Sequence, residues 1–438
     1  MSKGNSIDRR EFILKMGRFS SAAVVGNGLF SFISLLPKAV KADILANVYV
    51  AKNGTPAENV AKAFDMRFGG IENFIGSDDV VVINPNGQWT NQGGSNCECC
   101  MGLIDLILNR PGGFSGEIIF TECTQSVTAG YWTATSYELT RNGPYNFNDM
   151  ITYYHNAGHN NVSGVRIWRN KEDSTNWPII TGPQQGQGWV RLEWVSPTNQ
   201  KFGIPYPIIR SPYSNRLIDL KNGVYHDGYS GQPALKFIKV PTLNNHGYEA
   251  QQDYAGVTSA TKSFLGIAEV GGWSSTWDFH WSLHAYGDLG AEAVGQAIGA
   301  WINNVRKPDI FLTSAEWVGW GSRFGPDATQ ARTVALGDDP VSLDYYMCKN
   351  VMYPIYPNQP YFDPDYNIAS NNTRLTLNGC QSQGIGTTDG ASIAAFTYDF
   401  DNPTIFKFDI DRKLKAFKAG QATEQEILDL IESYFMGK

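Results

Sequence analysis

The sequence predicts an α/β fold in which a mainly parallel sheet is flanked by helices and interrupted by an irregular, aromatic-rich, partly antiparallel insertion. Three observations lead to this fold class. Three β-rich runs alternate with two helical patterns between residues 47 and 121, which is typical of a parallel sheet with right-handed crossovers. Residues 79–83 are continuously apolar, as a strand buried on both faces requires. The alternation returns after residue 235.

Capping and breaking residues define the ends of the predicted helices. The first helix begins at the capping box Thr55-Pro56-Ala57-Glu58 and ends near Gly69-Gly70. The next, residues 99–109, ends at a Pro-Gly-Gly sequence. The terminal helix, residues 423–435, also starts with a capping box and has one apolar face. We predict strands at residues 47–51, 79–83, 117–121, 162–168, 189–195, 235–240, 309–313 and 404–408, and the remaining helices at residues 147–156, 257–266, 291–305 and 341–352.

The segment of residues 125–233 differs in composition from the rest of the chain, because it is dense in Gly, Asn, Pro, Trp and Tyr. Many aromatic side chains imply packing, so we interpret it as a folded insertion rather than a linker. An alternative role for its tryptophans is an exposed surface on which sugar rings stack. The residues concerned are Trp132, Trp168, Trp177, Trp189 and Trp194.

The N-terminus resembles a twin-arginine (Tat) signal peptide. Arg9 and Arg10 are followed by Phe, Ile, Leu and Lys, and Asp8 is a departure from the consensus. Residues 19–36 are apolar but interrupted by glycines and serines, which suits a signal-peptide core better than a membrane span. We therefore expect residues 1–42 to direct export by the Tat translocase to the periplasm or the extracellular space. The alternative is an Arg-rich amphipathic N-terminus of a cytoplasmic protein.

The charge and the length of the chain restrict its partners and its domains. The net charge is −7, and residues 1–42 carry a net charge of +5, so the remainder carries −12. No run of Lys or Arg follows, so we expect no nucleic-acid partner. No later apolar stretch is long enough to cross a bilayer. We expect residues 43–400 to form the α/β domain and residues 401–438 a C-terminal extension made of a strand and a helix.

Several segments, in this order, resemble one family. Residues 79–86 are similar to its strand that ends in Lys-Pro-Asn, and residues 114–122 resemble its next strand. The later matching segments are residues 237–246, 256–266, 307–312, 325–326 and 336–344. The family is Domain of Unknown Function 362, members of which are sometimes fused to iron–sulfur ferredoxin modules. The resemblance covers most of residues 46–355 and implies an α/β fold.

Departures from the family's pattern bear on the ligand. Asn84 stands where the family has a lysine before Pro-Asn, and Thr242, Asn244 and Asn245 replace lysines near Pro241. If those lysines hold an anionic group in relatives, this chain would take a neutral ligand or none. No Cys-x2-Cys-x2-Cys run is present, which argues against an intrinsic ferredoxin-type iron–sulfur cluster. A metal ion stays open, and the cofactor is otherwise unknown.

Polar side chains follow several of the predicted strands. Loops after the carboxyl ends of parallel strands converge on one crevice. His246 could serve there as a general base or a metal ligand, or simply be held by a backbone carbonyl. Lys262 could bind an anion or lie on the surface. The candidate catalytic residues are His246, Glu122 and Lys262, and the candidate ligand-binding residues are Asn84, Asn86, Glu316, Asp339 and Asp344.

Two further clusters of residues are candidates for metal binding or redox chemistry. His280 and His284 are four residues apart, so on a helix they would share a face and could bind zinc or a similar ion. The cysteines cluster near the start of the helix predicted at residues 99–109, where the helix dipole lowers the pKa of a thiol. Disulfides are the default in an exported chain, and a redox pair or a metal site are the alternatives. The cysteines concerned are Cys97, Cys99, Cys100 and Cys123.

Two functions remain open from the sequence. The first is a small ligand, metal or cofactor bound in the crevice beyond the strand ends, with redox or transfer chemistry there. The second is a non-catalytic extracytoplasmic protein that binds a ligand or carbohydrate. The phosphate-loop and Gly-x-Ser-x-Gly motifs are absent, so no reaction is assigned.

Overall fold

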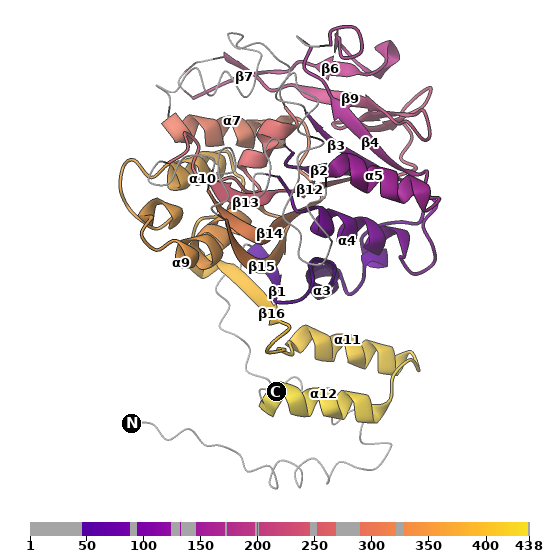
Figure 1. The fold of residues 1–438 in the computed structure, drawn as a ribbon, viewed down its shortest axis with the longest axis vertical. Helices are drawn as coiled ribbons and strands as arrows, with labels where there is room; N and C mark the ends of the chain where they lie inside the picture. The colour runs from indigo at the N-terminus through magenta and orange to yellow at the C-terminus, as the bar shows by residue number, and fades with distance from the viewer. Residues whose placement is uncertain are drawn as a thin grey trace. The chain divides into compact units, whose positions relative to one another are not determined.

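A mixed, mainly parallel sheet forms the centre of the fold (Figure 1). The computed structural model describes residues 46–87, 94–123, 132, 146–170, 173–197, 199, 201–245, 252–268, 290–320 and 328–436, all within one compact unit. The strand order is β16-β1-β15-β14-β12-β2-β3-β4, with β13 paired to β14. The strands are β1 (Ala46–Lys52), β2 (Val80–Pro85), β3 (Glu117–Cys123), β4 (Val162–Ile167), β12 (Leu235–Val240), β13 (Thr242–Asn245), β14 (Ile310–Trp320), β15 (Ala328–Gly337) and β16 (Ile393–Asp399).

The direction of the strands confirms the predicted fold class. Every neighbouring pair in this sheet is parallel except the two pairs made by β15, which is antiparallel to β1 and to β14. The central strands β2 and β3 are buried along their whole length. A continuously apolar strand is therefore covered on both faces, as residues 79–83 predict.

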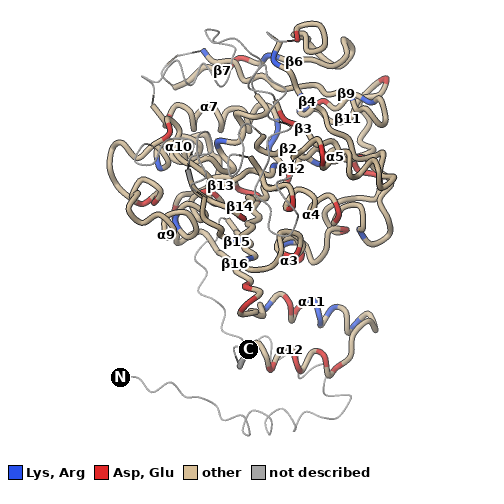
Figure 2. Tube along the Cα trace, in the orientation of Figure 1, with Lys and Arg blue, Asp and Glu red and all other residues tan. Residues whose placement is uncertain are grey.

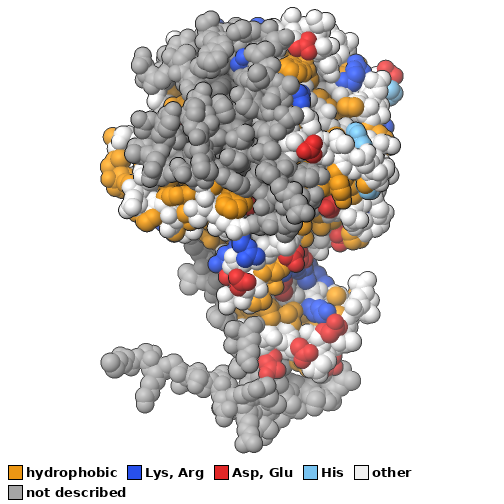
Figure 3. Space-filling model, in the orientation of Figure 1, with side chains coloured by type: hydrophobic (Ala, Val, Ile, Leu, Met, Phe, Trp, Pro, Cys, Tyr) orange, Lys and Arg blue, Asp and Glu red, His pale blue; other side chains and the backbone are white. Residues whose placement is uncertain are grey.

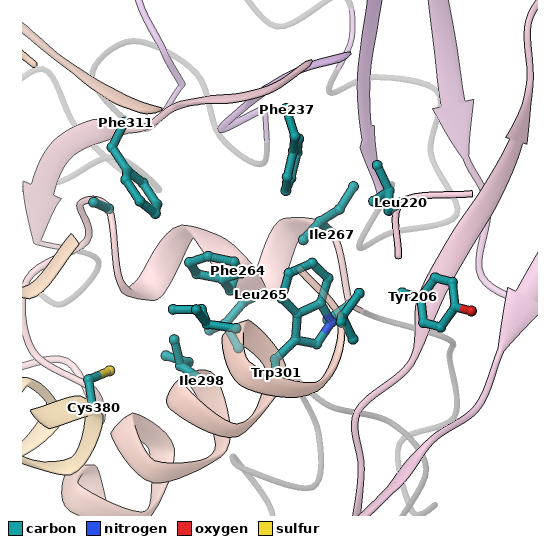
Figure 4. Packing of buried hydrophobic residues seen from close by; sticks show 14 of the residues in the cluster. Tyr206, Leu220, Phe237, Phe264, Leu265, Ile267, Ile298, Trp301, Phe311 and Cys380 are labelled. Atoms are coloured by element: carbon teal, nitrogen blue, oxygen red, sulfur yellow. The ribbon is translucent and has the colours of Figure 1, made fainter. Parts of the chain in front are cut away.

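Helices cover both faces of the sheet. One apolar layer includes α3 (Pro56–Phe68), α4 (Cys97–Leu108) and α5 (Phe147–Asn156). The other includes α7 (Gly290–Asn304), where Trp301 packs on Phe264 with ring centroids 5.1 Å apart (Figure 4). The start of α3 has the predicted capping box, since Thr55 accepts a hydrogen bond from the Glu58 amide.

The C-terminal third is largely helical. The chain ends in the helices α11 and α12; Figure 2 shows Lys and Arg together with Asp and Glu on α11, but only acidic residues on α12. An ion pair of 2.9 Å between Lys413 and Glu426 links these two helices. The remaining helical elements are η1 (Ile71–Asn73), η4 (Pro183–Gln185), η5 (Lys262–Gly266), α8 (Pro340–Met347), η7 (Cys348–Met352), α9 (Tyr353–Ile355), η8 (Pro360–Phe362), α10 (Asn372–Ser382), η9 (Gly390–Ser392), α11 (Lys407–Lys418) and α12 (Glu424–Met436).

The insertion folds into two small sheets, mainly antiparallel, as its composition predicts. The larger sheet has the order β11-β10-β9-β6-β5, and β7 pairs with β8. The single strand predicted at residues 189–195 is wrong, because Arg191 and Leu192 separate β6 from β7. The strands are β5 (Ile179–Ile180), β6 (Gly188–Val190), β7 (Glu193–Val195), β8 (Lys201–Gly203), β9 (Tyr206–Arg210), β10 (Leu217–Asp219) and β11 (Gly223–Tyr225).

Two other predicted elements are wrong. The helix expected at residues 257–266 is reduced to η5, because polar residues there bond to other elements: Thr258 forms a bridge with Asn244 of β13. The strand expected at residues 404–408 is also absent. Residues from Lys407 onward form α11, whose first turn is capped where Asp409 accepts a hydrogen bond from the Phe406 amide at 2.8 Å.

Among the described residues, no helix combines the length and the apolar composition needed to cross a bilayer. On the face drawn in Figure 3, apolar, basic and acidic side chains of the coloured residues lie intermingled.

Candidate functional site

Buried polar side chains gather where the central parallel strands end. Asn84 of β2, Glu122 of β3 and Lys239 of β12 all lie within two residues of the carboxyl end of their strand and are at most 3% exposed. These three strands are neighbours in the sheet, in the order β12-β2-β3. The structure therefore brings together two residues that the sequence predicts, Asn84 and Glu122, with one that it does not, Lys239.

The Lys239 ammonium is fully enclosed. Its Nζ donates hydrogen bonds to Asn84 Oδ1 at 2.5 Å and to the Ser263 carbonyl at 3.0 Å, and it lies 4.6 Å from the centre of the Phe264 ring. Burial lowers the pKa of Lys239 from 10.5 to about 7, and the negative charge of Glu122 opposes that shift. Near neutral pH this amine therefore exchanges between a charged and a neutral form.

Two glycines make room for the Glu122 carboxyl group. A Cβ at Gly266 would lie 2.8 Å from Glu122 Oε1, and one at Gly87 would overlap Oε2. Gly87 follows β2, and Gly266 ends η5. Any larger residue at either position would displace the carboxyl group, so Glu122 is confined between two loops at this edge of the sheet.

Asn86 links three loops at the same edge. The backbone N–H of Asn86 donates a hydrogen bond to Ser95 Oγ at 2.9 Å, and the side-chain Oδ1 of Asn86 accepts one from the backbone N–H of Thr242 at 3.3 Å. Ser95 Oγ in turn donates to the Val240 carbonyl. The side chain of Asn86 therefore joins the end of β2 to the β12–β13 connection and supports the position of Asn84 and Lys239.

Glu316 occupies the opposite face of the sheet, against α3 and α4. Its Oε1 accepts a hydrogen bond from Asn59 Nδ2 at 3.1 Å and one from Cys99 Sγ at 3.7 Å, whereas its buried Oε2 has no hydrogen-bond partner among the described residues. Burial raises the pKa of Glu316 to about 7. The residue sits at a bulge where Ala331 and Arg332 of β15 oppose it, a distortion that turns a side chain to a new direction.

The remaining candidates, Asp339, Asp344 and Lys262, have partners within the protein. Asp339 caps α8 by accepting from the Val341 amide at 2.9 Å. Asp344 accepts from the Ala260 amide at 2.7 Å, and burial raises its pKa to about 6. Lys262 is buried in an ion pair of 2.7 Å with Asp253. In this structure these residues hold loops beside the strand ends.

The three candidate histidines, His246, His280 and His284, lie outside the described residues. In the sequence, His246 directly follows Asn245, the last residue of β13. Within the described ranges, no group of three or more His, Cys, Asp or Glu side chains has the arrangement to hold a metal ion.

The cysteines form no disulfide, which corrects the pairing expected for an exported chain. All six lie in described segments, are buried and remain as thiols. Cys97, Cys99 and Cys100 belong to the first turn of α4, which Asn96 caps by accepting from the Cys99 amide at 2.9 Å. Cys123 ends β3. Each cysteine side chain fills space in one of the two apolar layers.

The tryptophans of the insertion lie in or against the core. Trp132, Trp177 and Trp189 are at most 3% exposed, and Trp168 and Trp194 are partly buried against the core. Trp177 and Trp189 lie at an angle of 53°. Among the described residues these rings therefore form no exposed coplanar pair for a sugar to stack on.

Sequence reasoning missed Lys239 and Asn59. Lys239 stands in an apolar run, Phe-Ile-Lys-Val, where a charged residue inside a predicted buried strand was a usable signal. Asn59 has no such signal, because it looks like any polar residue of an amphipathic helix.

A scan against protein-family models and a search of curated proteins both found no match.

Proposed function

We propose that this protein binds a small ligand in a crevice over the carboxyl ends of β2, β3 and β12, and acts there as a redox or transfer enzyme. The observation that supports this is the buried contact of Lys239 with Asn84, beside the carboxyl group of Glu122. Ligands of open α/β sheets bind beyond the strand ends, where the order of strands departs from the order of the chain. Here β12 lies next to β2, although about 150 residues of the insertion and α4–α5 region separate them in sequence.

The cluster has the groups that proton transfer requires. An amine with a pKa near 7 can accept or donate a proton at neutral pH, and a carboxyl group beside it can take the complementary role. Keeping both in an apolar surrounding strengthens their interaction with a bound charge. His246, which follows β13 in sequence, remains the proposed general base or metal ligand, and Asn84 and Asn86 the proposed hydrogen-bonding groups.

Native mass spectrometry of the exported protein, together with metal analysis and an absorption spectrum, tests this proposal. We expect a bound small molecule or metal that is lost in Lys239→Met. Lys236→Met is the matched control, because Lys236 lies on the same strand but at its amino end, with its Nζ 5.0 Å from the Phe74 ring. A colourless protein without bound mass, or a ligand retained equally by both variants, would contradict the proposal. A bound sugar would favour the non-catalytic alternative.

We also propose that residues 1–42 act as a Tat signal, and that the protein reaches the periplasm or the extracellular space through the Tat translocase. The support is the pair Arg9-Arg10 before an interrupted apolar segment. Replacing both arginines by lysine should leave the protein in the cytoplasm. Arg18→Lys is the control and should still be exported. Unchanged export of the variant with both Arg9 and Arg10 replaced would contradict the proposal.

A further inference from the structure

A hollow lies at the amino-terminal edge of the main sheet, away from the site proposed above. The cavity has a volume of 180 Å³ and is bordered by the first residues of β2 and β3 and by the turn of the insertion after β9. Its polar lining consists of Asp78, Ser115, Glu117, Tyr213, Ser214 and Arg216.

Glu117 is a buried residue of the cavity wall and is held in place by hydrogen bonds. The side chain is only 2% exposed although it carries a carboxyl group. Its Oε1 accepts a hydrogen bond from Ser214 Oγ at 2.6 Å, and its Oε2 accepts one from Ser211 Oγ. These hydroxyls tie the turn of the insertion to the start of β3. Each carboxyl oxygen keeps a second lone pair that can accept a further hydrogen bond.

The cavity is lined by charges of both signs that do not neutralise each other. In the described part of the chain, no carboxyl group lies within ion-pair distance of the Arg216 guanidinium, and Asp78 forms no ion pair. Asp78 and Arg216 nevertheless border the same space. A purely anionic ligand would meet Asp78 and Glu117, and a purely cationic one would meet Arg216.

We propose that this cavity binds a small zwitterion that carries a primary ammonium group and a carboxylate. The ammonium would donate hydrogen bonds to Glu117 and Asp78, and the carboxylate would accept a paired hydrogen bond from the guanidinium of Arg216. The volume is below the roughly 300–1,000 Å³ of pockets for drug-sized ligands, which restricts the ligand to the size of a free amino acid. Val80 and Pro233 supply a short apolar wall.

Calorimetric titration of the full chain with glycine, β-alanine and 4-aminobutyrate tests the proposal, since the series varies the distance between the two charges. We expect at least one of them to bind, and acetate and methylammonium, which each carry one of the charges, to bind at least tenfold more weakly. Glycine betaine has no N–H group and should also bind at least tenfold more weakly. Equal binding of acetate, or no binding of any of the three amino acids at 20 mM, would overturn the proposal.

Variants separate this cavity from the rest of the surface. Arg216→Gln should weaken binding at least tenfold. Arg210→Gln is the matched control, because Arg210 lies at the end of β9 in the same turn and its guanidinium already bonds to Asn215 at 3.2 Å. Asp78→Asn should also weaken binding. Undiminished binding by Arg216→Gln refutes the assignment, and Lys239→Met should leave it unchanged because the two sites are at opposite edges of the sheet.

Discussion

Individual buried ionisable groups should make the free energy of unfolding of this protein depend on pH. Lys239 and Glu316 are both fully buried, and both have a pKa near 7 for the same reason, since burial disfavours the charged form of each. Their effects have opposite sign. The charged form is the protonated one for the lysine and the deprotonated one for the glutamate.

For Lys239, stability should rise with pH. Its pKa falls from 10.5 in the unfolded chain to about 7 in the folded protein, so between these values the unfolded chain binds more protons and loses them as the pH rises. We expect Lys239→Met to abolish that rise, which is up to about 1.4 kcal/mol per pH unit. Urea unfolding at pH 7, 8 and 9 measures it. Lys236→Met should keep the wild-type slope, and an unaltered slope in Lys239→Met would show that the amine is not desolvated.

For Glu316, stability should fall as the pH rises. The folded pKa of about 7 lies above the ordinary value of 4.5, so the stabilisation is complete below pH 4.5 and is lost as the pH passes 7. Glu316→Gln cannot ionise and should therefore gain stability relative to wild type between pH 5 and pH 8, by up to about 3 kcal/mol. Unfolding curves of wild type and Glu316→Gln at pH 5 and pH 8 measure the difference in their free energies of unfolding. If this difference is the same at both pH values, Glu316 is not protonated in the folded protein.

At the scale of elements, patterns along the chain predict most helices and the central strands. The capping box at Thr55 and the apolar run before Asn84 depend on neighbours within a few residues, and so can be read locally. The strand β15 could not be predicted, because its first half, Ala328–Arg332, has no apolar pattern and is at most partly buried, and only pairing with β14 and β1 orders it. The same applies to the residues just before η5, where Thr258 pairs with Asn244 of β13 instead of extending a helix.

The contact between α3 and α4 should tolerate no added methyl group. A Cβ at Gly102 would lie 2.8 Å from the Cα of Ala57, a backbone atom of α3 that cannot turn aside. Alanine raises helix propensity by about 1 kcal/mol, but separating the helices costs more, so Gly102→Ala should lower the free energy of unfolding by about 1–2 kcal/mol. Gly231→Ala, where no atom lies within 4 Å, should change it little. Equal stability of Gly102→Ala and wild type would mean that the helices separate easily.

At the scale of the whole molecule, the buried thiols determine the response to reducing agents. None of the six cysteines forms a disulfide, and burial holds the pKa of Cys348 and Cys380 well above the ordinary range. We therefore expect the same Tm with and without dithiothreitol, measured by scanning calorimetry of the purified protein. A disulfide typically contributes 2–4 kcal/mol, so a fall of several degrees in reductant would show that cysteine pairs form.

Part of the candidate site could be predicted from the sequence because its residues follow parallel strands. Because the central strands are parallel, the residues after them lie at one edge, and this places Asn84, Asn86 and Glu122 near each other without any knowledge of packing. The partners of these residues depend on the packed structure. Asp344 of α8 accepts a hydrogen bond from the Ala260 amide, 84 residues earlier in the chain, and Lys262 pairs with Asp253 of the same connecting segment.

Local sequence patterns were therefore sufficient for the fold class, the central strands and the order in which polar residues follow them, since periodicity and capping act over a few residues. Only the folded chain decided that β15 runs antiparallel, that the cysteines fill core positions and that Lys239 lies against Asn84. Each of those outcomes is a contact between segments distant in the sequence, whose free energy comes from burial and pairing that no single segment contains.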